Sequence, residues 1–262
     1  MGNKILLGQY VETNSIIHRL DPRSKLVCML AMMLSFFTLQ SLINYTAATV
    51  IVFFVLLLSR IPFHKYARGL KPLLFILMFT FVYHALMTEG TVIWSWSVIK
   101  ITTEGLQNGS FVVWRIILLI LLSSVLTLTT KPLTLAQGLE KLMSPLSKLH
   151  VPIEQFSLMI VIAIRFIPTI VEELDRIMLA QKARGYDIAS LKLPRRMFAY
   201  IPLLVPLLIT TIQRAEQLSL AINARAYGNG RGRTVYKQLK LKRIDYLVAC
   251  FTAILALIML LS

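Results

Sequence analysis

The stretch between Lys25 and Arg60 contains no charged residue. As one straight helix it would measure about 50 Å at 1.5 Å per residue, whereas the hydrocarbon core of a bilayer is about 30 Å thick. The stretch must therefore fold back on itself, and the polar pair Gln40-Ser41 marks the place. We expect two membrane-spanning helices here, at about 25–41 and 43–59.

Three more apolar runs predict further spans, at about 72–87, 109–130 and 244–261. The chain is 56% hydrophobic and only 15% charged, a balance that excludes an ordinary soluble domain. Between the third and fourth runs, alternation over 92–98 suggests a small surface hairpin. We therefore predict an all-α polytopic membrane protein with about five transmembrane helices, joined by three long coupling helices described below.

Basic residues orient these spans, because they collect on the cytoplasmic side of membrane proteins. They flank the first span and fill the 60–71 loop, whereas the 88–108 connection holds few of them and carries Trp94 and Trp96. This pattern places the N-terminus in the cytoplasm and the C-terminus outside a prokaryotic cell membrane. The net charge of +16 is explained in the same way, without nucleic acid.

The segment 131–243 is basic yet rich in apolar residues. Its pattern predicts three helices, over about 132–149, 152–184 and 195–228. We expect a membrane domain over 1–130, a cytoplasmic coupling domain over 131–243 and a last transmembrane helix within 244–262. The second and third helices form a weak internal repeat when aligned on Arg184 and Arg225.

Each repeated helix ends on an arginine between small residues, in Ala183-Arg184-Gly185 and in Ala224-Arg225-Ala226. A cation at a helix C-terminus is favoured by the helix dipole alone, by about 0.3–1 kcal/mol. Small neighbours also let a partner surface approach, and a guanidinium can bind a carboxylate with two hydrogen bonds. The spacing leaves both interpretations open.

Several motifs resemble the transmembrane T-component of energy-coupling factor (ECF) transporters, the EcfT/CbiQ-like family. They are Leu20-Asp21-Pro22-Arg23-Ser24-Lys25, Thr129-Thr130-Lys131-Pro132, Arg165-Phe166-Ile167-Pro168 and the two arginine motifs. The resemblance covers essentially the whole chain. It implies that Arg184 and Arg225, with their small neighbours, dock into grooves on two ABC-type ATPases.

The resemblance further implies a non-enzymatic scaffold that couples ATP hydrolysis to a separate substrate-binding membrane subunit, the S-component, for uptake of a vitamin or a transition metal. The chain has no G-x-x-x-x-G-K-[ST] motif, so we expect no cofactor here and ATP on the partner ATPases. Contact with the substrate-binding subunit is assigned to apolar residues of the coupling helices: Met159, Ile160, Met178, Leu179 and Leu218.

Two alternatives differ in class. A self-sufficient ABC permease would need its own substrate site, but mid-span Asp and Glu residues are lacking in the first four spans. A membrane enzyme would use Glu173, Asp175 or Asp187, although these form no catalytic constellation. His84 and Arg115 lie near the outer ends of their spans, where snorkelling accounts for them. Cys28 and Cys250 read as packing residues, and no metal site is expected.

Overall fold

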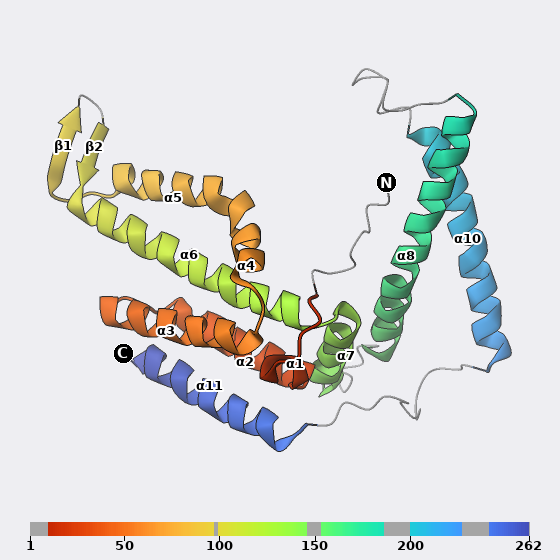
Figure 1. Cartoon of the computed structure of the whole chain (residues 1–262), viewed down its shortest axis with the longest axis horizontal. Helices are drawn as coiled ribbons and strands as arrows, with labels where there is room; N and C mark the ends of the chain where they lie inside the picture. Colours follow the sequence, from red (N-terminus) through yellow and green to blue (C-terminus); the bar gives the residue numbers. More distant parts are fainter. Residues whose placement is uncertain (1–9, 97–98, 146–152, 186–199, 227–240, 262) are drawn as a thin grey trace. The chain divides into compact units, whose positions relative to one another are not determined.

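A computed structural model describes residues 10–96, 99–145, 153–185, 200–226 and 241–261 (Figure 1). The chain divides into two compact units, one of residues 1–7 and 143–238 and the other of residues 8–142 and 239–262. The second unit is the membrane unit; the first contains the two long helices that carry the arginine motifs. Each unit is described separately.

The membrane unit contains helices and one short hairpin. Its elements are α1 Ile16–Arg19, α2 Pro22–Phe36, α3 Leu42–Ser59, α4 Phe63–Leu70, η1 Lys71–Leu73, α5 Leu74–Met87, β1 Val92–Trp96, β2 Ile99–Thr102, α6 Thr103–Thr129, α7 Pro132–Met143 and α11 Arg243–Leu261. The other unit contains α8 Ile153–Ala183 and α10 Ile201–Ala224. The predicted all-α class is confirmed, and the surface hairpin expected near 92–98 is present as the antiparallel pair β1-β2.

Four helical segments of the described chain are long and apolar enough to cross a membrane: Leu42–Ser59, Phe63–Met87, Thr103–Thr129 and Arg243–Leu260. The predicted first span is different, because α2 has 15 residues and ends at Phe36. At 1.5 Å per residue it measures about 22 Å, less than a full crossing. The fold-back near residue 40 is confirmed, since Ser41 caps the start of α3 through the Ile43 N–H.

The predicted span at 72–87 is longer than expected, because the helical segment begins at Phe63. It is not straight: Pro72 lies in the 3₁₀ turn η1, and Figure 1 shows α4 and α5 running in different directions on either side of it. Proline cannot donate the backbone hydrogen bond that a continuous α-helix needs. Within the predicted coupling helix 132–149, α7 ends at Met143, and residues 146–149 of this prediction lie outside the described residues.

Small residues let α5 and α6 approach closely. Gly105 and Gly109 are one turn apart on α6, as in the G-x-x-x-G pattern of closely packed membrane helices. A Cβ atom added at Gly105 would lie 2.8 Å from the carbonyl oxygen of His84, and one added at Gly109 would lie 3.2 Å from that of Phe81. Larger side chains at either position would force the two helices apart.

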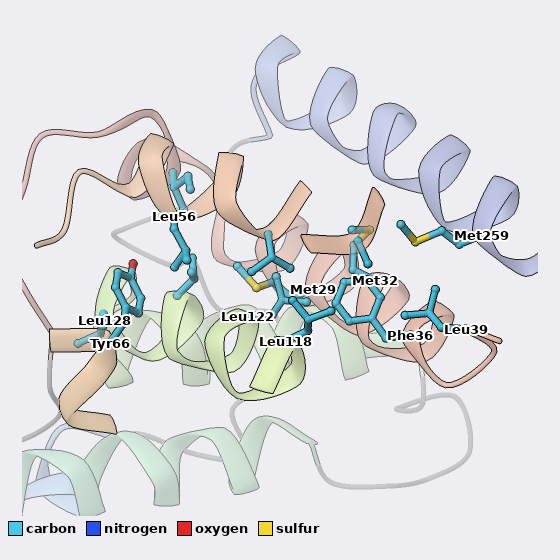
Figure 2. Packing of buried hydrophobic residues seen from close by; sticks show 14 of the residues in the cluster. Met29, Met32, Phe36, Leu39, Leu56, Tyr66, Leu118, Leu122, Leu128 and Met259 are labelled. Carbon is cyan, nitrogen blue, oxygen red and sulfur yellow. The ribbon is translucent and has the colours of Figure 1, made fainter. Parts of the chain in front are cut away.

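A buried apolar cluster joins α2, α3, α6 and α11 (Figure 2). Phe36 and Met32 of α2 face Leu118 and Leu122 of α6, and Met259 brings α11 into the same cluster. Between α3 and α6 the Tyr45 ring stacks on Phe111 at 4.9 Å between centroids. These apolar contacts pack the four membrane helices against one another.

Candidate functional site

Arg184 follows the last residue of α8 and begins a tight backbone turn. Its N–H donates to the carbonyl oxygens of Ala180 at 3.2 Å and Gln181 at 3.1 Å, and the N–H of Gly185 donates to Lys182 at 3.0 Å. Gly185 has φ +83°, the left-handed conformation that commonly ends helices. The side chain of Arg184 is exposed just before this turn.

The second motif has the same geometry at the end of α10. The Arg225 N–H donates to the Ala221 carbonyl oxygen at 3.2 Å, and the Ala226 N–H donates to that of Asn223 at 2.9 Å. Ala226 has φ +50°, so an alanine occupies the left-handed position that glycine fills in the first motif. Both arginines are therefore exposed helix-end residues in matching backbone settings, as the sequence predicted.

An ion pair joins the two long helices at their crossing. Arg214 of α10 donates from Nη2 to Oε2 of Glu173 of α8 at 3.0 Å, and Arg176 lies 4.0 Å from the same oxygen. Glu173 and Arg214 are 41 residues apart, which is also the separation of Arg184 and Arg225. The ion pair therefore joins equivalent positions of the internal repeat.

This pairing gives the helices an approximate two-fold relation. Figure 1 shows α8 ending beside the start of α10, so the helices run in opposite directions. Arg184 lies eleven residues beyond Glu173, and Arg225 lies eleven residues beyond Arg214. We call each of these eleven-residue segments, from the ion pair to the arginine, an arm; it is about 16 Å long at 1.5 Å per residue. The two arginines therefore lie at opposite ends of the helix pair, up to about 30 Å apart.

The residues expected to contact a substrate-binding subunit are distributed along the same two helices. Met159 and Leu179 are the most exposed, at 65% and 68%, while Ile160 and Met178 are exposed to 41% and 40%. Leu218 on α10 is half-buried. Helical periodicity places Ile160 and Met178 on one face of α8, with Met159 and Leu179 to either side. Their role stays a prediction.

A buried polar cluster, formed by Asp21, Lys25, Asp245, Thr129 and Thr130, lies at one end of the membrane unit. The Asp245 carboxylate accepts the N–H of Asp21 at 2.8 Å through Oδ1, and Asp245 is 2% exposed. The Lys25 ammonium donates to the Thr129 carbonyl oxygen at 3.2 Å and to Oγ1 of Thr130 at 3.3 Å. The starts of α2 and α11 and the end of α6 are thereby tied together.

The cluster also reaches the first coupling helix. A Cβ atom added at Gly138 of α7 would lie 3.1 Å from the Cβ atom of Pro22, so α7 packs directly on the first turn of α2. Sequence reasoning assigned no role to Asp245 and used the 20–25 and 129–132 motifs only as signs of resemblance. Four of their polar residues, Asp21, Lys25, Thr129 and Thr130, belong to this cluster. A carboxylate in the first turn of an apolar helix was the available signal for Asp245.

Arg115 corrects one expectation. Its Nη2 donates to the carbonyl oxygen of Leu39 at 2.5 Å, and its guanidinium lies 5.8 Å from the centre of the Tyr45 ring. The side chain therefore binds the connection between α2 and α3 instead of only snorkelling. His84 is half-buried and packs edge-on against Tyr83.

The candidate catalytic carboxylates do not form a constellation within the described residues. Glu173 is engaged by Arg214, Asp175 is exposed on α8, and Asp187 lies outside the described residues. Among the residues that the structure describes, no three His, Cys, Asp or Glu side chains gather in a group that could hold a metal ion. Cys28 is buried, whereas Cys250 is exposed.

Comparison with known proteins covers nearly the whole chain. The family model CbiQ, described as cobalt transport protein, matches residues 13–236. The chain belongs to this family. It is also 42% identical to the energy-coupling factor transporter transmembrane protein EcfT of Thermosediminibacter oceani, over 97% of this chain and 96% of that protein. The EcfT proteins of Lactococcus lactis subsp. cremoris and Bacillus subtilis are 40% and 42% identical, over 98% and 91% of this chain and 97% and 91% of their own lengths.

The family match spans both arginine motifs and the Glu173–Arg214 ion pair. It ends before α11, which carries Asp245. The relative from Lactococcus lactis aligns over 98% of the chain, so its similarity extends into this last helix. Family membership and four apolar membrane-length helices together make this chain the membrane component of a transport system.

Proposed function

We propose that the chain is the transmembrane scaffold of an energy-coupling factor transporter, which joins two cytosolic ABC ATPases to a separate substrate-binding membrane subunit. The observation that carries the proposal is the symmetry of α8 and α10 about the Glu173–Arg214 ion pair. A pair of ATPases presents two equivalent surfaces related by an approximate two-fold axis. Arg184 and Arg225, at the ends of equal arms, match such a pair.

The chemistry at each arm suits an acidic groove. Arg184 and Arg225 are exposed, and their immediate neighbours Ala183, Gly185, Ala224 and Ala226 carry no side chain larger than a methyl group. A guanidinium can form two parallel hydrogen bonds to a carboxylate at close approach. ATP binding and hydrolysis belong to the partners, and this chain transmits their movement without catalysing a reaction.

The arrangement of helix ends supports the proposed orientation. The start of α2, the end of α6 and the start of α11 meet in the polar cluster, and the positive-inside rule assigned these same three ends to the cytoplasm. The basic residues Arg19, Arg60 and Arg243 flank this side. We therefore place the arginine motifs and the N-terminus in the cytoplasm and the C-terminus outside.

Charge reversal tests the docking role. The full-length chain would be co-expressed with the ECF-type ATPases and the substrate-binding subunit of its source organism, and the complex purified through a tag on the membrane chain. Arg184→Glu/Arg225→Glu should lose the ATPases while retaining the substrate-binding subunit, because acidic grooves would repel the new carboxylates. The control Arg68→Glu/Lys71→Glu reverses two exposed charges on the membrane unit and should leave the complex intact.

The single variants separate the two arms. If each arginine binds one ATPase, Arg184→Glu and Arg225→Glu should each weaken the complex. Neither remaining native arginine should be able to hold both ATPases. If the charge-reversed protein keeps both ATPases and normal ATP-driven uptake, the arginines serve only to stabilise the helix ends and do not dock the ATPases. Intact uptake without any separate substrate-binding subunit would favour the permease alternative.

A further inference from the structure

The membrane unit contains an apolar cleft of about 490 Å³ between α1, α2, α3 and α11. Its walls include Val50 and Phe54 of α3, Met32 of α2, and Leu247, Phe251 and Leu255 of α11. Four of these side chains, those of Val50, Phe54, Leu247 and Phe251, are more than half exposed. The cleft is thus an open apolar surface among helices that lie in a bilayer.

The dimensions of the cleft fit an acyl chain. Leu247 and Leu255 are eight residues apart on α11, so this wall is about 12 Å long. Water is excluded as a stable filling, because the lining offers almost no polar partner.

One end of the cleft is positively charged. Arg19, Arg60 and Arg243 are exposed, and each stands at the end of an element that lines the cleft: α1, α3 and α11 respectively. Lys242 is also exposed there, and the buried Lys25 reaches the cleft wall. Phosphate headgroups of anionic lipids are attracted to such basic groups at a membrane surface.

The acidic residues on these elements do not cancel this charge. Asp21 and Asp245 are buried, and the nearby cations Lys25 and Arg23 offset their charge, with Nε of Arg23 3.8 Å from Oδ1 of Asp21. Glu12 is paired with Lys131 at 2.9 Å. The exposed rim, consisting of Arg19, Arg60, Lys242 and Arg243, is therefore purely cationic.

We propose that this cleft binds an anionic phospholipid, with one acyl chain against α3 and α11 and its phosphate at the cationic rim. The apolar volume and the basic rim are adjacent on the same elements, which is the pattern that a lipid with a charged head and an apolar tail requires. The bound lipid would stabilise the contact between α2, α3 and α11. This inference is independent of which partners the arginine motifs bind.

The test measures lipid retention by the full-length chain in a mild detergent, using native mass spectrometry. Phosphatidylglycerol and phosphatidylcholine with identical acyl chains serve as probes. The wild-type chain should retain one phosphatidylglycerol at least ten-fold better than one phosphatidylcholine. Val50→Trp/Leu247→Trp, which fills the cleft, should lose the retained lipid.

The matched control for the tryptophan variant is Ile43→Trp/Leu257→Trp. It changes one exposed residue on each of the same two helices, outside the cleft lining, and should retain lipid like the wild type. Arg19→Gln/Arg243→Gln should reduce the preference for phosphatidylglycerol by roughly five-fold per arginine. Arg68→Gln/Lys71→Gln should leave the preference unchanged.

Three results would overturn the proposal. Equal retention of the two lipids by the wild type would show that the cationic rim does not select an anionic headgroup. Equal lipid retention by the two tryptophan variants would show that the lipid does not bind in the cleft. Cross-linking of Leu247→Cys to another membrane protein in the assembled transporter would show that a partner helix occupies this surface. The arginine variants change only exposed side chains, so they keep the test valid if the tryptophan variant does not fold.

Discussion

Asp245→Asn tests whether the buried polar cluster holds the membrane unit together. In the native protein both carboxylate oxygens accept backbone N–H groups, Oδ1 from Asp21 at 2.8 Å and Oδ2 from Lys242 at 2.7 Å. An asparagine amide has one acceptor oxygen, and its NH₂ group would face a donor. One buried N–H group therefore loses its partner, and the Lys25 ammonium loses an attracting charge.

The expected loss of unfolding free energy in Asp245→Asn can be worked out from these effects. An unsatisfied buried donor costs about 1–3 kcal/mol, and loss of a charge-assisted hydrogen bond adds about 1 kcal/mol. Unfolding free energy should fall by about 2–4 kcal/mol. In a protein of this size 1 kcal/mol corresponds to about 2–4 °C, so the melting temperature should drop by about 5–15 °C. Tryptophan fluorescence during a thermal melt in detergent measures this shift.

A double-mutant cycle separates the cluster from a local effect of the substitution. Lys25→Met should also destabilise the protein. The double variant Lys25→Met/Asp245→Asn should lose at least about 1 kcal/mol less unfolding free energy than the sum of the two single losses, because each single variant leaves the partner's buried charge uncompensated and the double variant does not. Asp175→Asn, an identical change at an exposed position, is the control and should shift the melt by less than 1 °C. The reasoning would be refuted if the two single losses of unfolding free energy were additive, or if the melting temperature of Asp245→Asn lay within 1 °C of the wild-type value.

Three further outcomes are expected. Ala226→Gly should slow hydrogen exchange in the last turn of α10, and Gly185→Ala should speed it in the last turn of α8. Each substitution should change the free energy of local opening by about 1 kcal/mol, because residues with a Cβ atom disfavour the left-handed backbone conformation at both positions. A steric clash does not contribute at Gly185, since an added Cβ atom would touch nothing within 4 Å. Burial lowers the pKa of His18, so its stabilising contribution is complete above about pH 6.5 and is lost as the pH falls through the lowered value; His18→Gln should flatten the dependence of melting temperature on pH between 7 and 5. Glu173→Arg should impair ATP-driven uptake, and Glu173→Arg/Arg214→Glu should restore at least half of it.

The His18 prediction depends on a specific hydrogen-bond pattern. Nε2 lies 2.9 Å from the carbonyl oxygen of Val11, which can only accept, so this nitrogen carries the proton. Nδ1 lies 2.7 Å from Oγ of Ser15 and accepts from it. Burial is the main cause of the lowered pKa, the Val11 hydrogen bond opposes it, and the charge of Lys25 lowers it further. A second proton on the ring would remove the acceptor that Ser15 uses.

The membrane helices were predictable where apolar length alone decides. The uncharged run after Lys25 had to fold back, and α3 begins within one residue of the predicted boundary. The predicted first span was wrong in length: the polar pair Gln40-Ser41 marked the fold-back correctly, but α2 already ends at Phe36, and Ser41 caps the next helix. The bend at Pro72 follows from proline chemistry, but the extension back to Phe63 does not.

The helix ends at Arg184 and Arg225 were predictable from the sequence, but the packing of the two helices was not. Each arginine motif had small residues at the end of an apolar helix, which predicts a helix terminus. No local pattern shows that Glu173 meets Arg214, because their contact depends on how α8 crosses α10. The polar cluster is equally non-local, since Asp21 and Asp245 are 224 residues apart in the sequence.

The repeat explains why the two arms have equal length. Two helices with a common sequence pattern pack in opposite directions most readily at equivalent positions, because each then presents the same surface to the other. The ion pair occupies such positions, and the arginines follow at equal distances on either side. In the proposed assembly, equal and opposite pulls at Arg184 and Arg225 would rotate the helices about Glu173 and Arg214 without displacing the crossing. Unequal arms would convert part of the same pull into sliding, so the eleven-residue spacing on both sides favours transmission by rotation.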